Sequence, residues 1–154
     1  MTMQSFFIPT TLPTLNEIIA AAKSGHGKGN SYSRMKKSVT DVVCWCAKEA
    51  KLKPMQQATI LFYWKEKSMR KDPDGFTSGG KKFILDGLVK AGIIPDDGWQ
   101  YIMGFSDIWA VDKENPGVYV ELYDAAGETI IPVSLKTKDL PHRKPKHILG
   151  KGFD

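Results

Sequence analysis

Residues 58–66, ATILFYWKE, constrain the fold more than any other stretch of the chain. They are rich in β-branched and aromatic side chains, and five apolar residues follow one another without interruption. Such a run predicts a strand that is covered on both faces and therefore lies in the middle of a sheet. The rest of the chain must supply strands to pair with it and elements to cover it.

The remaining segments alternate between strand-like and helix-like patterns. In the helix predicted at 31–51, Val39, Val42, Val43, Cys46 and Ala47 follow the spacing of one apolar stripe. Because the order shows no clean βαβ alternation, we expect an α+β fold, a single domain in which a mixed sheet packs with helices. Strands are predicted at 4–10, 101–111 and 117–125, the last two joined as a hairpin; helices are predicted at 12–25, 31–51 and 80–92, with a turn at 67–75.

The composition places limits on the class of protein. A chain of 154 residues suits one domain, and no apolar run reaches the roughly 18 residues that a membrane span needs. The start does not resemble a signal peptide, so we expect a cytoplasmic protein without a membrane partner. Cys44 and Cys46 point in different directions on a helix, which favours reduced thiols over a disulfide or a zinc site.

The charges are arranged in blocks. Residues 21–71 carry 12 Lys/Arg against 3 Asp/Glu, residues 72–131 carry 4 against 11, and residues 132–154 carry 6 against 2. Basic flanks suit a polyanion such as DNA, and an acidic centre would repel it unless a cation intervened. Simple solvated charge is the alternative. The predicted DNA contacts are Lys36, Lys37, Arg70, Lys71, Lys81, Arg143, Lys144 and Lys146.

Two acidic pairs enclose the predicted helix at 80–92. Asp72 and Asp74, in an extended segment, would share one face, and Asp96 and Asp97 begin the turn after the helix. Carboxylates with water and phosphate are the surroundings that Mg²⁺ prefers, so three carboxylates with Lys82 predict a metal site for a scissile phosphate. Ordinary turn chemistry explains both pairs equally simply, and Lys82 with Asp86 fits an exposed helix pair.

A nucleotide-binding loop is a weaker alternative for this region. Gly75, Gly80 and Lys81 have the spacing of a P-loop, but Lys82 stands where a Ser or Thr would hold Mg²⁺. A polar turn also precedes the glycines, where a P-loop has a buried strand. We therefore favour the metal site over a P-loop, and ordinary turn chemistry stays the alternative to both.

The stretch KDPDG…KKFILDGLVKAGIIPDD resembles the signature of the RusA family of Holliday junction resolvases of bacteria and phages. That signature has an acidic D-x-D-N pair, a lysine on the following helix, D-A-L-x-x-A-G and a closing D-D pair. LPTLN is similar to the family's N-terminal P-x-x-N element, at Pro13 and Asn16. The resemblance extends over roughly residues 4–125, and the central motif is its specific part.

The resemblance implies a RusA-like nuclease domain over 1–131, followed by a basic tail over 132–154. It implies a homodimeric endonuclease that uses Mg²⁺, with Mn²⁺ as a substitute, and makes paired symmetric nicks in four-way DNA junctions during recombination and repair. By this resemblance Asp72, Asp74 and Asp97 hold the metal, and Lys82 is catalytic. Asp96 and Asp86 orient these side chains without binding the metal themselves.

Two departures from the family pattern leave other functions open. Gly75 stands where the family has Asn, and GFTSGG lengthens the stretch between the first acidic pair and Lys82, so that Lys81 competes for the lysine position. One alternative is a protein that binds DNA branches without cutting them. Another is a nuclease that acts on flaps or other branches.

Overall fold

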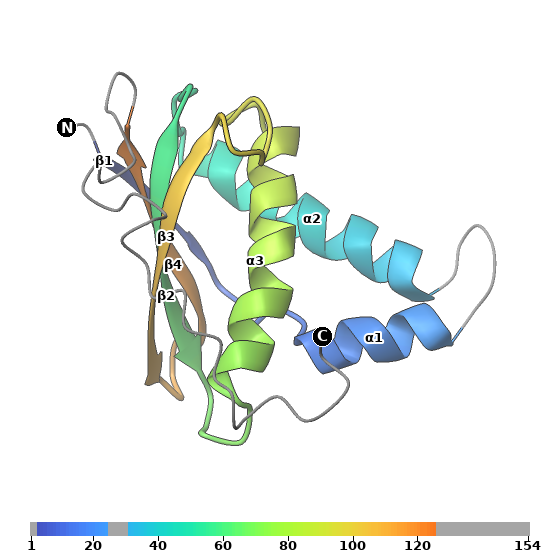
Figure 1. Ribbon diagram of the computed structural model, residues 1–154. Helices are drawn as coiled ribbons and strands as arrows, with labels where there is room; N and C mark the ends of the chain where they lie inside the picture. The colour runs from blue at the N-terminus through green and yellow to red at the C-terminus, as the bar shows by residue number, and fades with distance from the viewer. Residues whose placement is uncertain (1–2, 25–30, 126–154) are drawn as a thin grey trace, which may run out of the picture.

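A computed structural model describes residues 3–24 and 31–125 and shows one small α+β domain. A four-stranded mixed sheet carries three helices on one of its faces (Figure 1). The expected fold class is therefore confirmed. The elements in chain order are β1 (Met3–Ile8), α1 (Leu15–Lys23), α2 (Ser31–Glu49), β2 (Ala58–Glu66), α3 (Pro73–Lys90), β3 (Ile102–Val111) and β4 (Gly117–Asp124).

Strand β2 lies inside the sheet, whose order is β1-β4-β2-β3. Its interior position agrees with the sequence, but the expectation that both faces are covered is wrong. Only alternate residues are buried, because the three helices pack on one face and leave the other half-exposed. Ile60, Phe62 and Trp64, each at most 1% exposed, form the centre of the core on the helix side.

The predicted hairpin between β3 and β4 does not form, because β2 lies between them. β2, α3 and β3 instead make one βαβ unit, in which the helical crossover places β3 parallel to β2. The chain then returns in β4, which pairs antiparallel with β2 on its other side and with β1. The sequence reading missed this unit because helix α3 is longer than its apolar pattern suggests.

Helix α3 begins at Pro73, well before the predicted start at residue 80. Asp72 is its N-cap with an extended backbone (φ −74°, ψ 140°), and Pro73 occupies the first helical turn, where the missing N–H costs nothing. The DPDG segment is thus a helix start and not a free turn. Gly79 and Gly80 lie inside this helix, and a Cβ at either position would lie 2.6 Å from the 13–15 backbone or from Trp64, so this close packing requires glycine.

Helix α2 packs on α3 with a slightly different face from the predicted stripe. Val43 is fully buried, but Val42 is 39% exposed, while Thr40 and Cys44 are buried. The cause is Gly87 on α3, which has no side chain and admits Val43 and the backbone of Cys44 at close range. Cys44 and Cys46 are both free thiols, as expected.

Two further expectations concern a membrane-spanning helix and the basic tail. Within 3–24 and 31–125, no helix combines the length and the hydropathy that crossing a bilayer requires. The basic tail at 132–154, with the predicted DNA contacts Arg143, Lys144 and Lys146, lies outside the described residues.

Candidate functional site

Polar side chains occupy every fourth position of α3, in a row that winds partly around the helix. Residues four apart on a helix are neighbours, so these side chains form a continuous row along the helix. The row comprises Asp74, Ser78, Lys82, Asp86 and Lys90. The predicted site residues of this region therefore share one rigid element and have fixed spacings.

Lys82 is the centre of the site. Its Nζ donates a hydrogen bond to Asp86 Oδ1 at 3.1 Å and lies 3.7 Å from Asp97 Oδ2. Asp97 comes from the loop after α3, where its backbone N–H donates to the Asp96 carboxylate at 2.8 Å. The structure thus brings together Lys82, Asp86 and Asp97, three residues that the sequence singled out, and Asp96 supports the loop.

The two carboxylates stabilise the charged form of Lys82. The hydrogen bond to Asp86, reinforced by the negative charges of Asp86 and Asp97, raises the pKa of the Lys82 ammonium above its usual value. Lys82 therefore stays charged at neutral pH and acts as a fixed cation, not as a base. Its side chain is 51% exposed, so a ligand in solution can reach it.

Asp86 has an unused oxygen. Its Oδ1 accepts from Lys82, while its Oδ2 is buried and has no hydrogen-bond partner among the described residues. A buried carboxylate oxygen without a partner is costly, and a bound water or cation would relieve that cost. Asp86 can therefore accept one further hydrogen bond at Oδ2.

Asp72 and Asp74 lie at the N-terminal end of the same helix. Both are exposed, and Asp72 makes no side-chain capping bond. Within the described part of the chain, neither carboxylate forms an ion pair or accepts a hydrogen bond. The eight residues from Asp74 to Lys82 correspond to about 12 Å of helix rise, so this pair lies about two turns from Lys82.

The predicted ligands suit Mg²⁺ by chemistry but are divided by position. Uncommitted carboxylate oxygens are the ligand type that this ion prefers, and Asp72 and Asp74 offer them. Asp97 lies beside Lys82, in the middle of the row. Across residues 3–24 and 31–125 there is no group of three His, Cys, Asp or Glu side chains close enough to hold one metal ion.

Lys81 points away from this row and into the protein. Its Nζ pairs with Asp107 of β3 at 2.8 Å, its side chain is 19% exposed, and it lies over the rings of Phe62 and Phe105. Trp64 Nε1 donates to the same carboxylate at 2.9 Å. Lys81 was predicted as a DNA contact, and the structure uses it to hold α3 on the sheet.

Other predicted DNA contacts are surface cations. Lys36 and Lys37 are exposed on α2, where Lys37 lies 3.9 Å from Asp41. Arg70 is exposed just before α3, and Lys71 lies 3.9 Å from Glu17 of α1. These positions leave positive charge near both ends of the α3 row.

The sequence reading overlooked Glu66, the last residue of β2. It is 7% exposed, and burial raises the pKa of its carboxyl, with nearby Lys71 opposing and Glu17 adding to the shift. The sequence could have indicated this burial. Alternate residues of a strand point to the same face, so Glu66 shares the helix side with Ala58, Ile60, Phe62 and Trp64.

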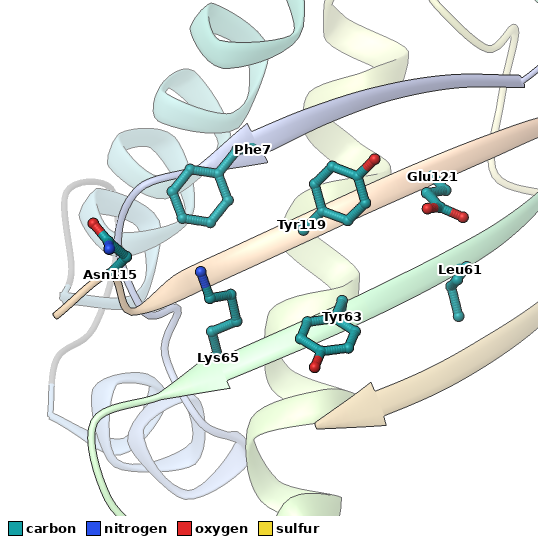
Figure 2. A pocket seen from close by; sticks show the side chains of 7 residues that line it. All are labelled: Phe7, Leu61, Tyr63, Lys65, Asn115, Tyr119 and Glu121. Atoms are coloured by element: carbon teal, nitrogen blue, oxygen red, sulfur yellow. The ribbon is translucent and has the colours of Figure 1, made fainter. Parts of the chain in front are cut away.

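A concavity on the opposite face of the sheet is separate from this site. Figure 2 shows Phe7, Tyr63 and Tyr119 lining it, with Lys65 towards one end and Glu121 towards the other. It lies on the face without helices, whereas the α3 row lies on the helix side. It contributes nothing to the chemistry around Lys82.

Comparison with known proteins adds no identity. No protein-family model matches the chain, and no match was found among the curated proteins. The likeness to resolvases therefore rests on the residues quoted above.

Proposed function

We propose that this chain is a Mg²⁺-dependent endonuclease of the resolvase type, which cuts four-way DNA junctions by paired nicks as a homodimer. The observation that carries the proposal is the meeting of Lys82 with Asp86 and Asp97 at 3.1 and 3.7 Å. These three residues come from separate parts of the RusA-like motif. Turn chemistry alone gives no reason for the second acidic pair to approach a helix lysine.

Lys82 has the properties needed to stabilise charge on a phosphate. It is a permanent cation, it is half-exposed, and two carboxylates hold its ammonium in place. A pre-positioned cation lowers the energy of the negative charge that develops when a phosphodiester bond breaks, because the cation needs no reorganisation at that moment. Asp86 and Asp97 thus position the cation.

The second part of the proposal is the metal site, which the carboxylates of the motif would form. Asp72 and Asp74 would hold Mg²⁺, which when bound polarises the phosphate and lowers the pKa of a water ligand. Asp97, the third ligand that the resemblance implies, lies beside Lys82 about two turns away and would have to approach this pair to join the metal. Asp72 and Asp74 remain uncommitted in the described structure, which agrees with a role as ligands. The exposed cations Lys36, Lys37 and Arg70 would contact the phosphates of the DNA arms.

A synthetic four-way junction tests the proposal directly. The full chain should nick two opposed strands at symmetric positions when Mg²⁺ is present and leave the junction intact in EDTA. A linear duplex of the same sequence is the matched control and should stay uncut. A chain that cuts neither substrate with Mg²⁺ or Mn²⁺, while folded, would exclude a junction-cutting nuclease.

A protein that binds branches without cutting is the second candidate. Gly75, at the N-terminal end of α3, favours it because the family has Asn at this position. In the same assay such a protein would shift the junction in a gel and leave all four strands whole with Mg²⁺. A flap-specific nuclease would instead cut a three-armed flap and spare the junction.

A further inference from the structure

Strand β3 forms an open edge of the sheet. It pairs with β2 along one side, and no strand among the described residues pairs with its other side (Figure 1). An edge strand presents a row of backbone N–H and C=O groups that can pair with another chain. At ten residues β3 is long for an edge.

The side chains of β3 do not protect this edge. The exposed fractions of Phe105, Ile108, Trp109 and Val111 are 43, 47, 52 and 41%. The strand contains no Pro, Lys or Arg, and its one charge, Asp107, is held by Lys81 and Trp64. Soluble proteins usually guard such an edge with charge or proline, so its composition indicates that it is covered by a partner.

We propose that the edge of β3 pairs antiparallel with β3 of a second copy of this chain, which joins the two sheets into one. The reason for a second copy is that the strand is complementary to itself in one register. A two-fold axis through Ile108 places Phe105 opposite the partner's Val111, and Trp109 opposite the partner's Asp107. Ile108 then faces the partner's Ile108.

Neighbouring registers place less compatible side chains opposite one another. An axis through Asp107 sets two Asp107 carboxylates directly opposite each other, and like charges in that position destabilise a strand pair. An axis through Ser106 places Phe105 opposite the partner's Asp107 and Ile108 opposite the partner's Gly104. An axis through Trp109 sets two Trp109 side chains opposite each other but places Val111 opposite the partner's Asp107. The register through Ile108 joins more of the exposed apolar side chains to one another, again without a like-charge pair.

Pairing through β3 would form the homodimer that the proposed function includes, so the biological role of this interface rests on that function. The evidence, however, is the strand itself. The dimer can be measured without DNA or metal, so its failure leaves the cleavage assay open. Absence of cleavage would likewise leave the dimer standing.

Cysteine cross-linking of the full chain tests both the surface and the register. Opposite residues of an antiparallel pair have Cα atoms roughly 4.5–5.5 Å apart, which a disulfide can bridge. Ile108→Cys should therefore form a covalent dimer under mild oxidation. Ala110→Cys is the matched control, because its counterpart in the partner lies about 13 Å along the strand.

A mixture of two variants makes the test more specific. Ser106 faces the partner's Ala110 in the proposed register, so Ser106→Cys mixed with Ala110→Cys should give a mixed disulfide that neither variant gives alone. Ile108→Lys should abolish the dimer in light scattering and keep the circular dichroism of the fold. A wild-type monomer at working concentration, or cross-linking by Ala110→Cys alone, would overturn the proposal.

Discussion

The ammonium of Lys82 lies 3.7 Å from the carboxylate of Asp97 and so joins the middle of α3 to the loop that follows the helix. The same ammonium donates to Asp86 one turn further along. Lys82 thereby joins Asp86 on the helix and Asp97 of the closing acidic pair to one positive charge, and the predictions for activity start from it.

Lys82→Ala should reduce junction cleavage far more than junction binding. Loss of one pre-positioned group that stabilises developing charge typically costs about 2.7–4 kcal/mol, or about a hundred- to a thousandfold in rate. Lys81→Ala is the control and should lower thermal stability with little effect on the cutting step, because Lys81 pairs with Asp107 inside the protein. The reverse result would show that Lys81 is the active lysine.

Asp72→Asn and Asp74→Asn should each abolish Mg²⁺-dependent cutting and preserve binding in EDTA. Both changes remove an ionised ligand, and Asn replaces Asp equally well as a helix N-cap, so the fold should survive. Cleavage assays and gel shifts on the same preparations measure the two effects. Normal cutting by either variant would remove that residue from the metal site.

Glu66→Gln should stabilise the protein increasingly as pH rises through the interval between the pKa of a glutamate in the unfolded chain, about 4.3, and the raised pKa of Glu66 in the folded chain. Burial raises the pKa of Glu66 in the folded state, so the unfolded chain releases this proton first and wild-type stability falls as pH rises through that interval. The neutral Gln avoids this loss. Urea unfolding at several pH values measures it, with exposed Glu114→Gln as control; a difference that stays constant with pH would contradict the burial effect.

Gly79→Ala should lower the free energy of unfolding by about 1–3 kcal/mol, the usual cost of overpacking. Its Cβ would meet backbone atoms of Pro13, Thr14 and Leu15 at 2.6 Å, and backbone cannot give way as a side chain can. Gly75→Ala is the control on the same helix, because its nearest neighbour, Thr14 Cβ, is 4.0 Å away. Equal effects would mean that α3 does not pack closely on the 13–15 segment.

Deleting residues 132–154 should weaken junction binding chiefly at low salt. The segment carries six Lys/Arg, and if about four of them meet phosphates, the slope of log affinity against log salt should become shallower by about 3–4. Titrations at several salt concentrations measure the slope. An identical slope in the shortened chain would show that these cations do not contact DNA.

The sequence predicted local elements better than their connections. The bounds of β2 agree with the predicted 58–66, because a run of β-branched and aromatic residues leaves few alternatives. The pairing of β3 with β2 was not predictable in the same way. It depends on the length of α3, whose first turns contain Pro73, Gly75, Gly79 and Gly80 and read as a loop by propensity alone.

The site shows a similar division. Lys82, Asp86 and Asp97 could be chosen from the motif, and their meeting follows from one helix and one loop. The inward direction of the Lys81 side chain could not be predicted. The side chains of adjacent helix residues point about 100° apart, and only the position of the sheet decides which of them faces it. Glu66 was missed because a buried carboxylate at a strand end looks like the start of a polar loop.

Because α3 is one continuous helix, the number of residues between Asp74 and Lys82 fixes both the distance between them and the direction in which Lys82 points. Loss of one residue between Asp74 and Lys82 would turn the lysine by about 100° and shorten the gap by about 1.5 Å, so that it would face a different side of the protein. Loss of four would return it nearly to its original direction, about 6 Å nearer. Among natural variants of this chain, length changes within this helix should therefore come in whole turns.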